Sequence, residues 1–206
     1  FDDILIIWFL VIAGGILAAT IQHFFITKKI PAYTFPFILV AWAFIFLIRQ
    51  YTEIPPSELL QIKFEPTQLD VFLAPTNGFG EVIFQASVLS GVIFFIAVFI
   101  NSPVAALYGL AASLLGAVLS VVNGQPLEQI NLGLFGFNAV LTAIVFAGTK
   151  KIDGLWVLSG AIITIVIHNL LIDHHILDVV GGVLTFPFVA GTWITLLIQK
   201  ILVKKV

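Results

Sequence analysis

The chain has 206 residues, of which 60% are hydrophobic and only 10% are charged. A soluble domain carries roughly 25% charged residues, so this composition excludes a soluble globular protein and indicates an integral membrane protein. The absence of cysteine excludes a disulfide framework and a thiolate metal site, and a net charge of −2 without a basic stripe gives no sign of a nucleic-acid partner.

Long uncharged runs divide the chain into membrane segments, because a helix needs about 20 apolar residues to cross a bilayer. Prolines and glycines interrupt these runs, so several segments are short and we expect tilted or broken helices. The fold class predicted is therefore an all-α integral membrane protein. The predicted segments are 4–26, 35–48, 82–100, 104–122, 132–148, 155–172 and 189–203.

The basic residues predict the orientation of these segments, since lysine and arginine accumulate on the cytoplasmic side. Threading the segments in order from a cytoplasmic 28–29 loop places seven of the nine basic residues on that side. The polar loop 49–70 and the loop 173–178 then fall on the opposite side. The seven residues are Lys28, Lys29, Lys150, Lys151, Lys200, Lys204 and Lys205.

One short sequence occurs twice. Thr-Phe-Pro-Phe stands at 34–37 and again at 185–188, and a tryptophan, Trp42 or Trp193, follows eight residues after each threonine. The loop before the first copy is placed inside, whereas loop 173–178 before the second is placed outside, so the copies run in opposite directions. This predicts an inverted repeat with a substrate site near the midplane. The alternative is that two helices share four residues by chance.

The proline of each copy predicts a helix that begins within the membrane. Proline lacks an N–H and disfavours helical geometry in the preceding residue, so Pro36 and Pro187 are expected to begin half-helices at depth. Irregular backbone there is tolerated only where it is buried in protein or lines a polar cavity. Bare carbonyls, two hydroxyls and two phenyl rings would then face a permeant; the side chains are those of Thr34, Phe37, Thr185 and Phe188. The alternative is a proline-started helix with a threonine N-cap.

Glu81 is the only charge between Val71 and Leu127. Burying an ionisable residue costs several kcal/mol unless it has a partner or water, so such a residue suggests a functional site. We predict a re-entrant helix over 79–88, with Glu81 at its N-terminus, where the helix dipole stabilises a carboxylate, and with Phe84 in its first turn. The alternative is a solvated helix cap at the membrane interface.

Further along, residues 133–144 read GLFGFNAVLTAI and place a ring and an amide side by side at Phe137 and Asn138. Small-residue helix packing would produce similar glycine and alanine spacing, so this segment alone has little specificity.

Together these motifs resemble the urea transporter family, whose signature Leu-Pro-x-x-Thr-x-Pro-Phe occurs once in each half. Residues 30–37 (IPAYTFPF) match with Ile30 in place of leucine, and residues 181–188 (GGVLTFPF) have two glycines in place of Leu-Pro. Residues 78–85 (GFGEVIFQ) resemble the pore helix of the family's second half, and residues 133–144 resemble its Gly-Phe-Asn-x-x-Leu-Thr segment.

The resemblance implies an inverted-repeat channel with broken and re-entrant helices at the midplane. Residues 1–48 would form the C-terminal part of the first repeat, 49–70 an extracytoplasmic loop, and 71–206 the second repeat with its pore helix. The pore helix and Gly-Phe-Asn segment of the first half are expected to be absent. The chain starts at Phe1 and contains no methionine, so we expect a fragment that cannot close a pore alone.

The resemblance also implies passive permeation of urea through a narrow slot, without a catalytic step or a cofactor. Urea has four N–H donors that need acceptors once water is removed, and phenyl faces would set a flat slot that excludes hydrated ions. Thr34 and Thr185 would face each other across the central site, and Asn138 could orient the slot instead of touching urea. The candidate substrate-binding residues are Thr34, Phe37, Glu81, Phe84, Phe137, Asn138, Thr185 and Phe188.

Family resemblance further implies a homotrimer in the lipid bilayer of a bacterial plasma (inner) membrane, with no nucleic-acid partner. One alternative is a channel for another small neutral solute such as ammonia or a short amide, which competition by urea analogues would separate. The other is a membrane metal protein that uses His168, His174 and His175, because imidazole is a good metal ligand. Chelator sensitivity would identify that case.

Overall fold

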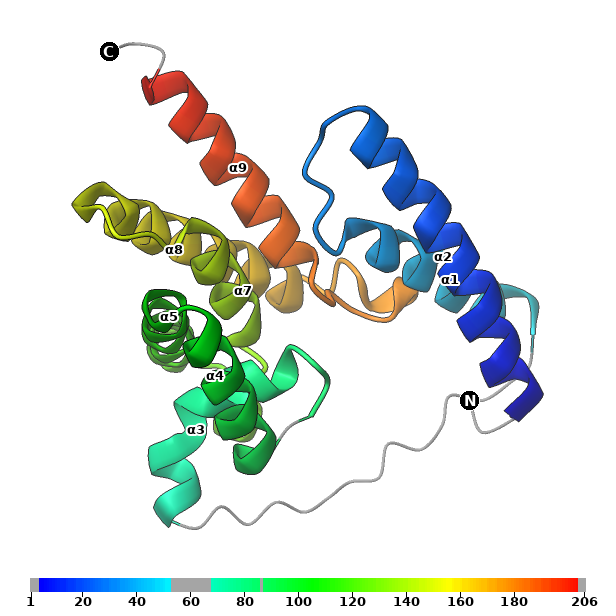
Figure 1. Cartoon of the computed structure of the whole chain (residues 1–206). Helices are drawn as coiled ribbons and strands as arrows, with labels where there is room; N and C mark the ends of the chain where they lie inside the picture. The colour runs from blue at the N-terminus through cyan, green and yellow to red at the C-terminus, as the bar shows by residue number, and fades with distance from the viewer. Residues whose placement is uncertain (1–3, 53–67, 86, 204–206) are drawn as a thin grey trace.

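The computed structural model describes residues 4–52, 68–85 and 87–203, and this part of the chain is helical, without strands (Figure 1). The elements are α1 (Ile4–Thr27), α2 (Phe35–Tyr51), α3 (Gln68–Glu81), α4 (Val88–Asn101), α5 (Pro103–Val122), α6 (Leu127–Asn131), α7 (Phe137–Phe146), α8 (Lys151–Asp173), the 3-10 helix η1 (Asp178–Val180) and α9 (Phe186–Val203).

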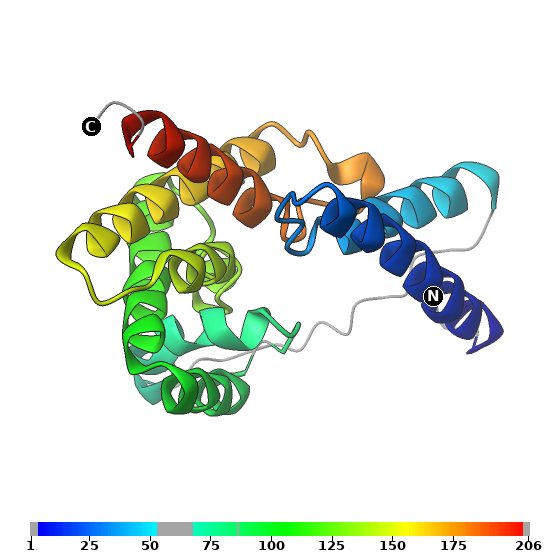
Figure 2. The ribbon, with the colours of Figure 1, turned by 45° about the horizontal axis from the view of Figure 1, so that its top comes forward.

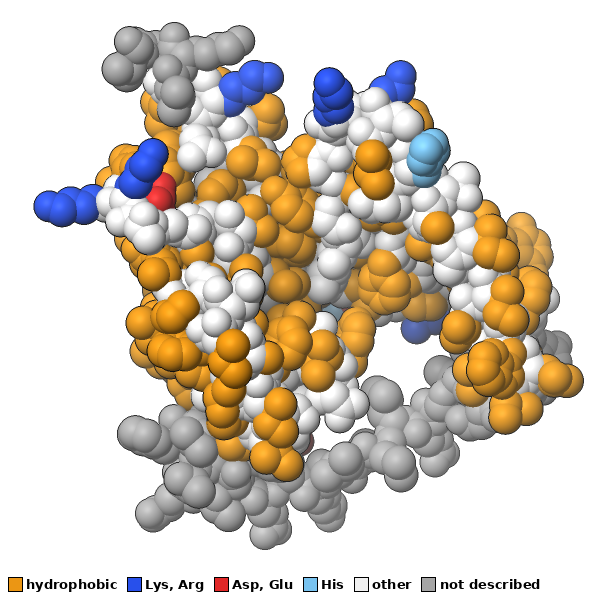
Figure 3. Space-filling model, viewed as in Figure 1, with side chains coloured by type: hydrophobic (Ala, Val, Ile, Leu, Met, Phe, Trp, Pro, Cys, Tyr) orange, Lys and Arg blue, Asp and Glu red, His pale blue; other side chains and the backbone are white. Residues whose placement is uncertain are grey.

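The predicted all-α membrane fold is confirmed. Among the described residues, α1, α5 and α8 are long and apolar enough to cross a bilayer, and α2, α4, α7 and α9 are shorter apolar helices. Many large apolar side chains are exposed, as the face of the molecule seen in Figure 3 shows, and no residue of α1 is buried. Most of predicted loop 49–70 lies outside the described residues, so its structure remains a prediction.

The prediction of a helix over 79–88 that starts near Glu81 is wrong, because α3 ends at Glu81 and α4 begins at Val88. Gly78 and Gly80, which precede Glu81 in the sequence, lie inside α3 and do not form a turn. A Cβ at Gly78 would collide with the Ser113 side chain, and one at Gly80 would lie 3.2 Å from the Gly91 nitrogen. Gly78 therefore serves the close approach of α3 and α5, and Gly80 leaves room for the Gln85 carbonyl of the following turn as well as for the start of α4.

The chain turns three residues later, at Phe84, which adopts a left-handed conformation with φ of 57°. The Phe84 N–H donates to the Glu81 carbonyl at 3.0 Å, and the Gln85 N–H donates to the Gly80 carbonyl at 3.1 Å. This pair of bonds closes the C-terminal end of α3 as in a Schellman motif. A predicted span of 82–100 accordingly starts later, with Ser87 as the N-cap of α4.

Two groups of helices meet in the middle of the molecule. Figure 1 shows α1 and α2 as one arm and α3 to α8 as the other, and Figure 2 shows the loops that precede α2 and α9 lying against each other between them. Within the larger arm, helices approach closely at small residues: Gly116 of α5 faces the Phe135 backbone, and Gly160 of α8 faces Thr142 of α7. This packing holds α7 and α9 in place around the site described below.

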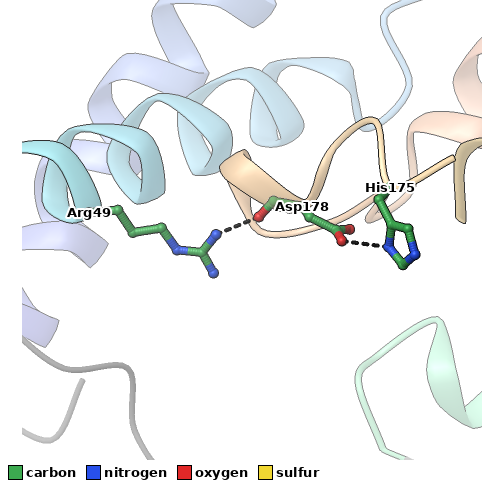
Figure 4. Close-up of polar contacts among 3 residues, drawn as sticks. All are labelled: Arg49, His175 and Asp178. Atoms are coloured by element: carbon green, nitrogen blue, oxygen red, sulfur yellow. Dashed lines mark hydrogen bonds and ion pairs between the residues drawn. The ribbon is translucent and has the colours of Figure 1, made fainter.

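Most of the basic side chains visible in Figure 3 gather at the end where α1 and α9 finish. At the other end, Arg49 of α2 donates to the carbonyl oxygens of Asp178 and Val179 (Figure 4). The C-terminal end of α2 and the 173–178 loop therefore lie together, in agreement with the predicted topology. Which end faces the cytoplasm remains a prediction.

Replacing Gly133 with alanine tests the close packing before α7. Gly133 has φ of 87°, and a Cβ there would lie 2.6 Å from the Gly78 nitrogen, whereas Gly124, with φ of 76°, has nothing within 4 Å. Both substitutions strain the backbone, but only Gly133→Ala adds overpacking, so it is expected to lower the free energy of unfolding by about 2 kcal/mol more than Gly124→Ala. Equilibrium unfolding in mixed micelles measures the difference, and equal losses would contradict the packing argument.

Candidate functional site

The two Thr-Phe-Pro-Phe segments come together across the middle of the molecule. The Thr34 and Thr185 hydroxyl oxygens lie 2.7 Å apart and share a hydrogen bond. The structure therefore brings these residues face to face, as the resemblance implied. It also differs from the expectation that they flank the solute, because at this distance no molecule fits between them. They form one polar surface instead of two walls.

The contacts around this pair are reciprocal. The Trp42 indole N–H donates to the Gly182 carbonyl at 3.0 Å, and the Trp193 indole N–H donates to the Pro31 carbonyl at 2.8 Å. Each carbonyl belongs to the residue three positions before the threonine of the other copy. The equal spacing of the two tryptophans from the threonines did not by itself predict these bonds. Because an indole N–H in an apolar span needs an acceptor, the spacing could have indicated one.

The aromatic rings around the threonine pair also make reciprocal contacts between the two copies. Phe35 contacts Trp193 with ring centroids 5.0 Å apart, and Phe186 contacts Trp42 with centroids 5.3 Å apart. Exchanging the two copies thus maps each contact onto its counterpart, as a twofold relation requires. The reciprocity weighs against chance similarity of the two sequence segments.

Both segments start helices in the same way. Tyr33 and Leu184, which precede the threonines, have φ of 50° and 47°, and α2 and α9 begin at the next phenylalanines with the prolines in their first turns. The Thr34 side chain makes no capping hydrogen bond and bonds to Thr185 instead. The alternative of a simple threonine N-cap therefore does not describe Thr34.

Asn138 forms hydrogen bonds to the second Thr-Phe-Pro-Phe segment. Its Nδ2 donates to the Leu184 carbonyl at 3.2 Å, and its Oδ1 accepts from the Phe188 N–H at 3.2 Å. The side chain is buried, and His168 Nδ1 lies 3.5 Å from its Nδ2. Two of the three hydrogen bonds of the Asn138 carboxamide go to backbone groups of the motif, so Asn138 joins α7 to the start of α9; that it orients the slot remains a prediction.

The first segment lacks this support among the described residues. The Phe37 N–H and the Tyr33 carbonyl correspond to the two groups that Asn138 binds, and no described residue bonds to either. An apolar groove of 350 Å³ lies between α1 and α2, and Gly14, Gly15 and Phe37 are among the residues that line it. Phe37 is 44% exposed, whereas its counterpart Phe188, next to α7, is 4% exposed. The two copies share a conformation but differ in what covers them.

The four candidate phenyl rings fall into two environments. Phe37 and Phe84 are exposed, and their ring centroids lie 6.4 Å apart. Phe188 and Phe137 are buried: Phe188 packs against Tyr33 at 5.2 Å and Phe137 against His168 at 6.0 Å. The structure brings together Phe37 and Phe84, and a slot-wall role for any of the four remains a prediction.

Glu81 occupies an electrostatically costly position. It is 8% exposed and ends α3, where the helix dipole disfavours a carboxylate, so the predicted favourable N-terminal position is overturned. Within the described part of the chain, no group donates a hydrogen bond to its carboxylate. A buried acceptor in such a place is suited to a ligand that brings N–H donors.

The histidines near the second copy do not converge. His168 is buried against Asn138, whereas His174 and His175 are exposed. His175 Nδ1 lies 2.8 Å from Asp178 Oδ2 (Figure 4). Among the described residues, no three His, Asp or Glu side chains are grouped so that they could hold a metal ion.

Comparisons with known proteins complete the description of the site. The family model for "Urea transporter" matches residues 1–200. Urea transporter 1 of Rattus norvegicus is 24% identical over 141 residues, which are 65% of this chain and 37% of that relative. Urea transporter 1 of Mus musculus is 28% identical over 58% of this chain and 33% of its own length, and that of Capra hircus is 26% identical over 82% and 47%. The chain thus spans a third to a half of the length of these relatives.

Proposed function

The chain belongs to the urea transporter family, and on that premise we propose that it contributes to a passive channel through which urea crosses the membrane. The observation that carries the proposal is the hydroxyl pair of Thr34 and Thr185, shared between two reciprocal half-helices. It is an integral membrane protein without an enzymatic role. The proposal therefore concerns the activity, which is passive permeation, and the substrate, which is urea.

The hydroxyl pair suits the chemistry of urea. Each hydroxyl has one O–H and two lone pairs, and their mutual bond uses one donor and one lone pair. One O–H is left for the urea carbonyl, and three lone pairs are left for its N–H groups. These groups compensate for the water that urea loses on entry, which would otherwise cost several kcal/mol.

Glu81 and two exposed rings supply the second part of the proposed path. The Glu81 carboxylate accepts urea N–H groups, and Phe37 and Phe84 offer apolar faces to a flat solute. Phe188 and Phe137 remain candidates for further walls of the slot. Glu81 is the only buried carboxylate among the described residues, which favours passive permeation, because coupled carriers use ion or proton sites within the membrane.

A closed passage requires the α1–α2 groove to be covered. In the second copy, Asn138 at the start of α7 binds the backbone beside Thr185. We propose that a helix of the same kind, with a carboxamide at its start, covers the groove and binds the Phe37 N–H and the Tyr33 carbonyl. The division of the chain into two inverted repeats around loop 49–70 belongs to this proposal.

Glu81→Gln tests the carboxylate. A carboxamide keeps the shape but replaces a charged acceptor by a neutral one, and charge-assisted bonds are about twice as strong. Urea flux into proteoliposomes is expected to fall about threefold to tenfold. Glu128→Gln, on exposed α6, is the matched control and should leave the flux unchanged. A fully active Glu81→Gln protein would remove Glu81 from the path.

The wider proposal has its own test. Urea flux through the complete protein should be inhibited by close urea analogues and unaffected by chelators; a flux of ammonia or short amides that ignores those analogues would instead support a different neutral solute. We also propose a homotrimer in a bacterial inner membrane. Mass measurement of the native complex extracted from such membranes would contradict this if it gave a monomer.

A further inference from the structure

We propose that Trp42 and Trp193 are positioning residues that hold the two half-helices in a fixed relative orientation and thereby fix where Phe37 and Phe188, the rings these half-helices carry, stand as walls of the urea slot. The inference rests on the proposed function and adds to it a determinant of selectivity between urea and its N-alkylated analogues. It starts from the reciprocal indole bonds to Gly182 and Pro31.

The two bonds run from a tryptophan side chain of one half-helix to the backbone of the segment before the other. Each indole extends from one half-helix and donates to a carbonyl in the segment that leads into the other, at 3.0 Å from Trp42 and 2.8 Å from Trp193. A main-chain acceptor cannot move without moving the loop that carries the threonine three residues later. Movement of one motif is therefore transmitted to the other.

The tryptophans lie well away from the threonine pair, so their bonds restrict rotation of one half-helix against the other. Trp42 follows Thr34 by eight residues, which is about two helical turns or about 12 Å along α2, and Trp193 has the same relation to Thr185. The Thr–Thr bond alone would leave the half-helices free to pivot about one point. Three bonds at separate places fix their relative orientation.

Ring packing limits the alternatives open to each indole. Trp193 contacts Phe35 at 5.0 Å and stacks on Phe25 at 6.3 Å, and Trp42 contacts Phe186 at 5.3 Å. Between them, Ile38 and Val189 are fully buried. The rings thus hold the indoles in place, and the N–H groups determine the register between the two segments.

A fixed orientation of the half-helices matters because urea and N-methylurea differ by one methyl group. A packed interior resists a change of one methylene, so a slot with fixed walls excludes the larger solute. A slot whose walls can part admits it. Loss of an indole N–H is therefore expected to affect selectivity more than the passage of urea itself.

The experiment compares Trp42→Phe, Trp193→Phe and the double variant with Trp8→Phe, because Trp8 lies 59% exposed on α1, away from the site. Phenylalanine keeps an aromatic ring and removes the N–H. In proteoliposomes of the complete protein, the ratio of N-methylurea flux to urea flux should rise about threefold in each single variant, as expected for one lost hydrogen bond, and should stay unchanged in Trp8→Phe. An unchanged ratio in the double variant overturns the proposal.

A second measurement is independent of transport. In indole-¹⁵N-labelled protein, hydrogen exchange at the Trp193 N–H should become at least about threefold faster in Trp42→Phe, and Trp8→Phe should have no effect. In the wild-type protein, the indole N–H groups of Trp42 and Trp193 should already exchange more slowly than that of Trp8, and equal exchange rates would overturn the proposal. This comparison does not depend on whether a variant folds. Wild-type protein that passes no urea refutes the proposed function, and the exchange rates still decide whether the indole bonds hold the segments together.

Discussion

Replacing Thr185 with valine is expected to reduce urea flux about tenfold or more while the protein still folds. Valine keeps the shape of threonine but removes the hydroxyl that bonds to Thr34 at 2.7 Å. An unsatisfied polar group costs about 1–3 kcal/mol, and about 1.4 kcal/mol corresponds to a factor of ten. Urea at this point would lose an acceptor and meet a Thr34 hydroxyl without its partner.

Thr20→Val is the matched control for this result. Among the described residues, the Thr20 hydroxyl bonds only to the Ile16 carbonyl of its own exposed helix, at 2.9 Å, so its loss should leave the flux unchanged. Stopped-flow light scattering of proteoliposomes with equal protein content measures all three proteins. Wild-type flux through Thr185→Val would remove the hydroxyl pair from the permeation path, and with it the main support for the proposed function.

Replacing Asn138 with leucine is expected to lower the free energy of unfolding by about 2–6 kcal/mol. The substitution leaves the Phe188 N–H and the Leu184 carbonyl without partners, and each buried orphan group costs about 1–3 kcal/mol. Because both groups belong to the start of α9, any protein that still folds should also lose most of its urea flux.

Asn101→Leu, at the exposed end of α4, provides the control and should change stability by about 0.5 kcal/mol or less. Equilibrium unfolding in mixed micelles reports the difference between the two variants. If Asn138→Leu proved as stable as the control but lost urea flux, Asn138 would contact urea directly instead of orienting the half-helix.

Local sequence patterns predicted much of this molecule. The charge-free runs located the apolar helices, and Pro36 and Pro187 marked where α2 and α9 begin, because a missing N–H and a fixed φ act on the chain's own neighbours. The family resemblance implied that Thr34 and Thr185 face each other across a solute, and the structure brings them face to face but in direct contact, 2.7 Å apart. The pattern around Glu81 failed, because Gly78 serves a contact with Ser113 of α5, which lies far along the chain, and Gly80 packs against the turn at Gln85 and the first turn of α4.

The sequence by itself therefore determined the membrane class, the starts of α2 and α9 and the duplication, since each depends on composition or on residues a few positions apart. Only the tertiary structure decided that the two threonines touch, that Asn138 binds the backbone beside Thr185, and that each tryptophan bonds to the opposite copy. These bonds join residues 46 to 162 positions apart. Their partners are selected by how helices pack at small residues, and no local pattern records that choice.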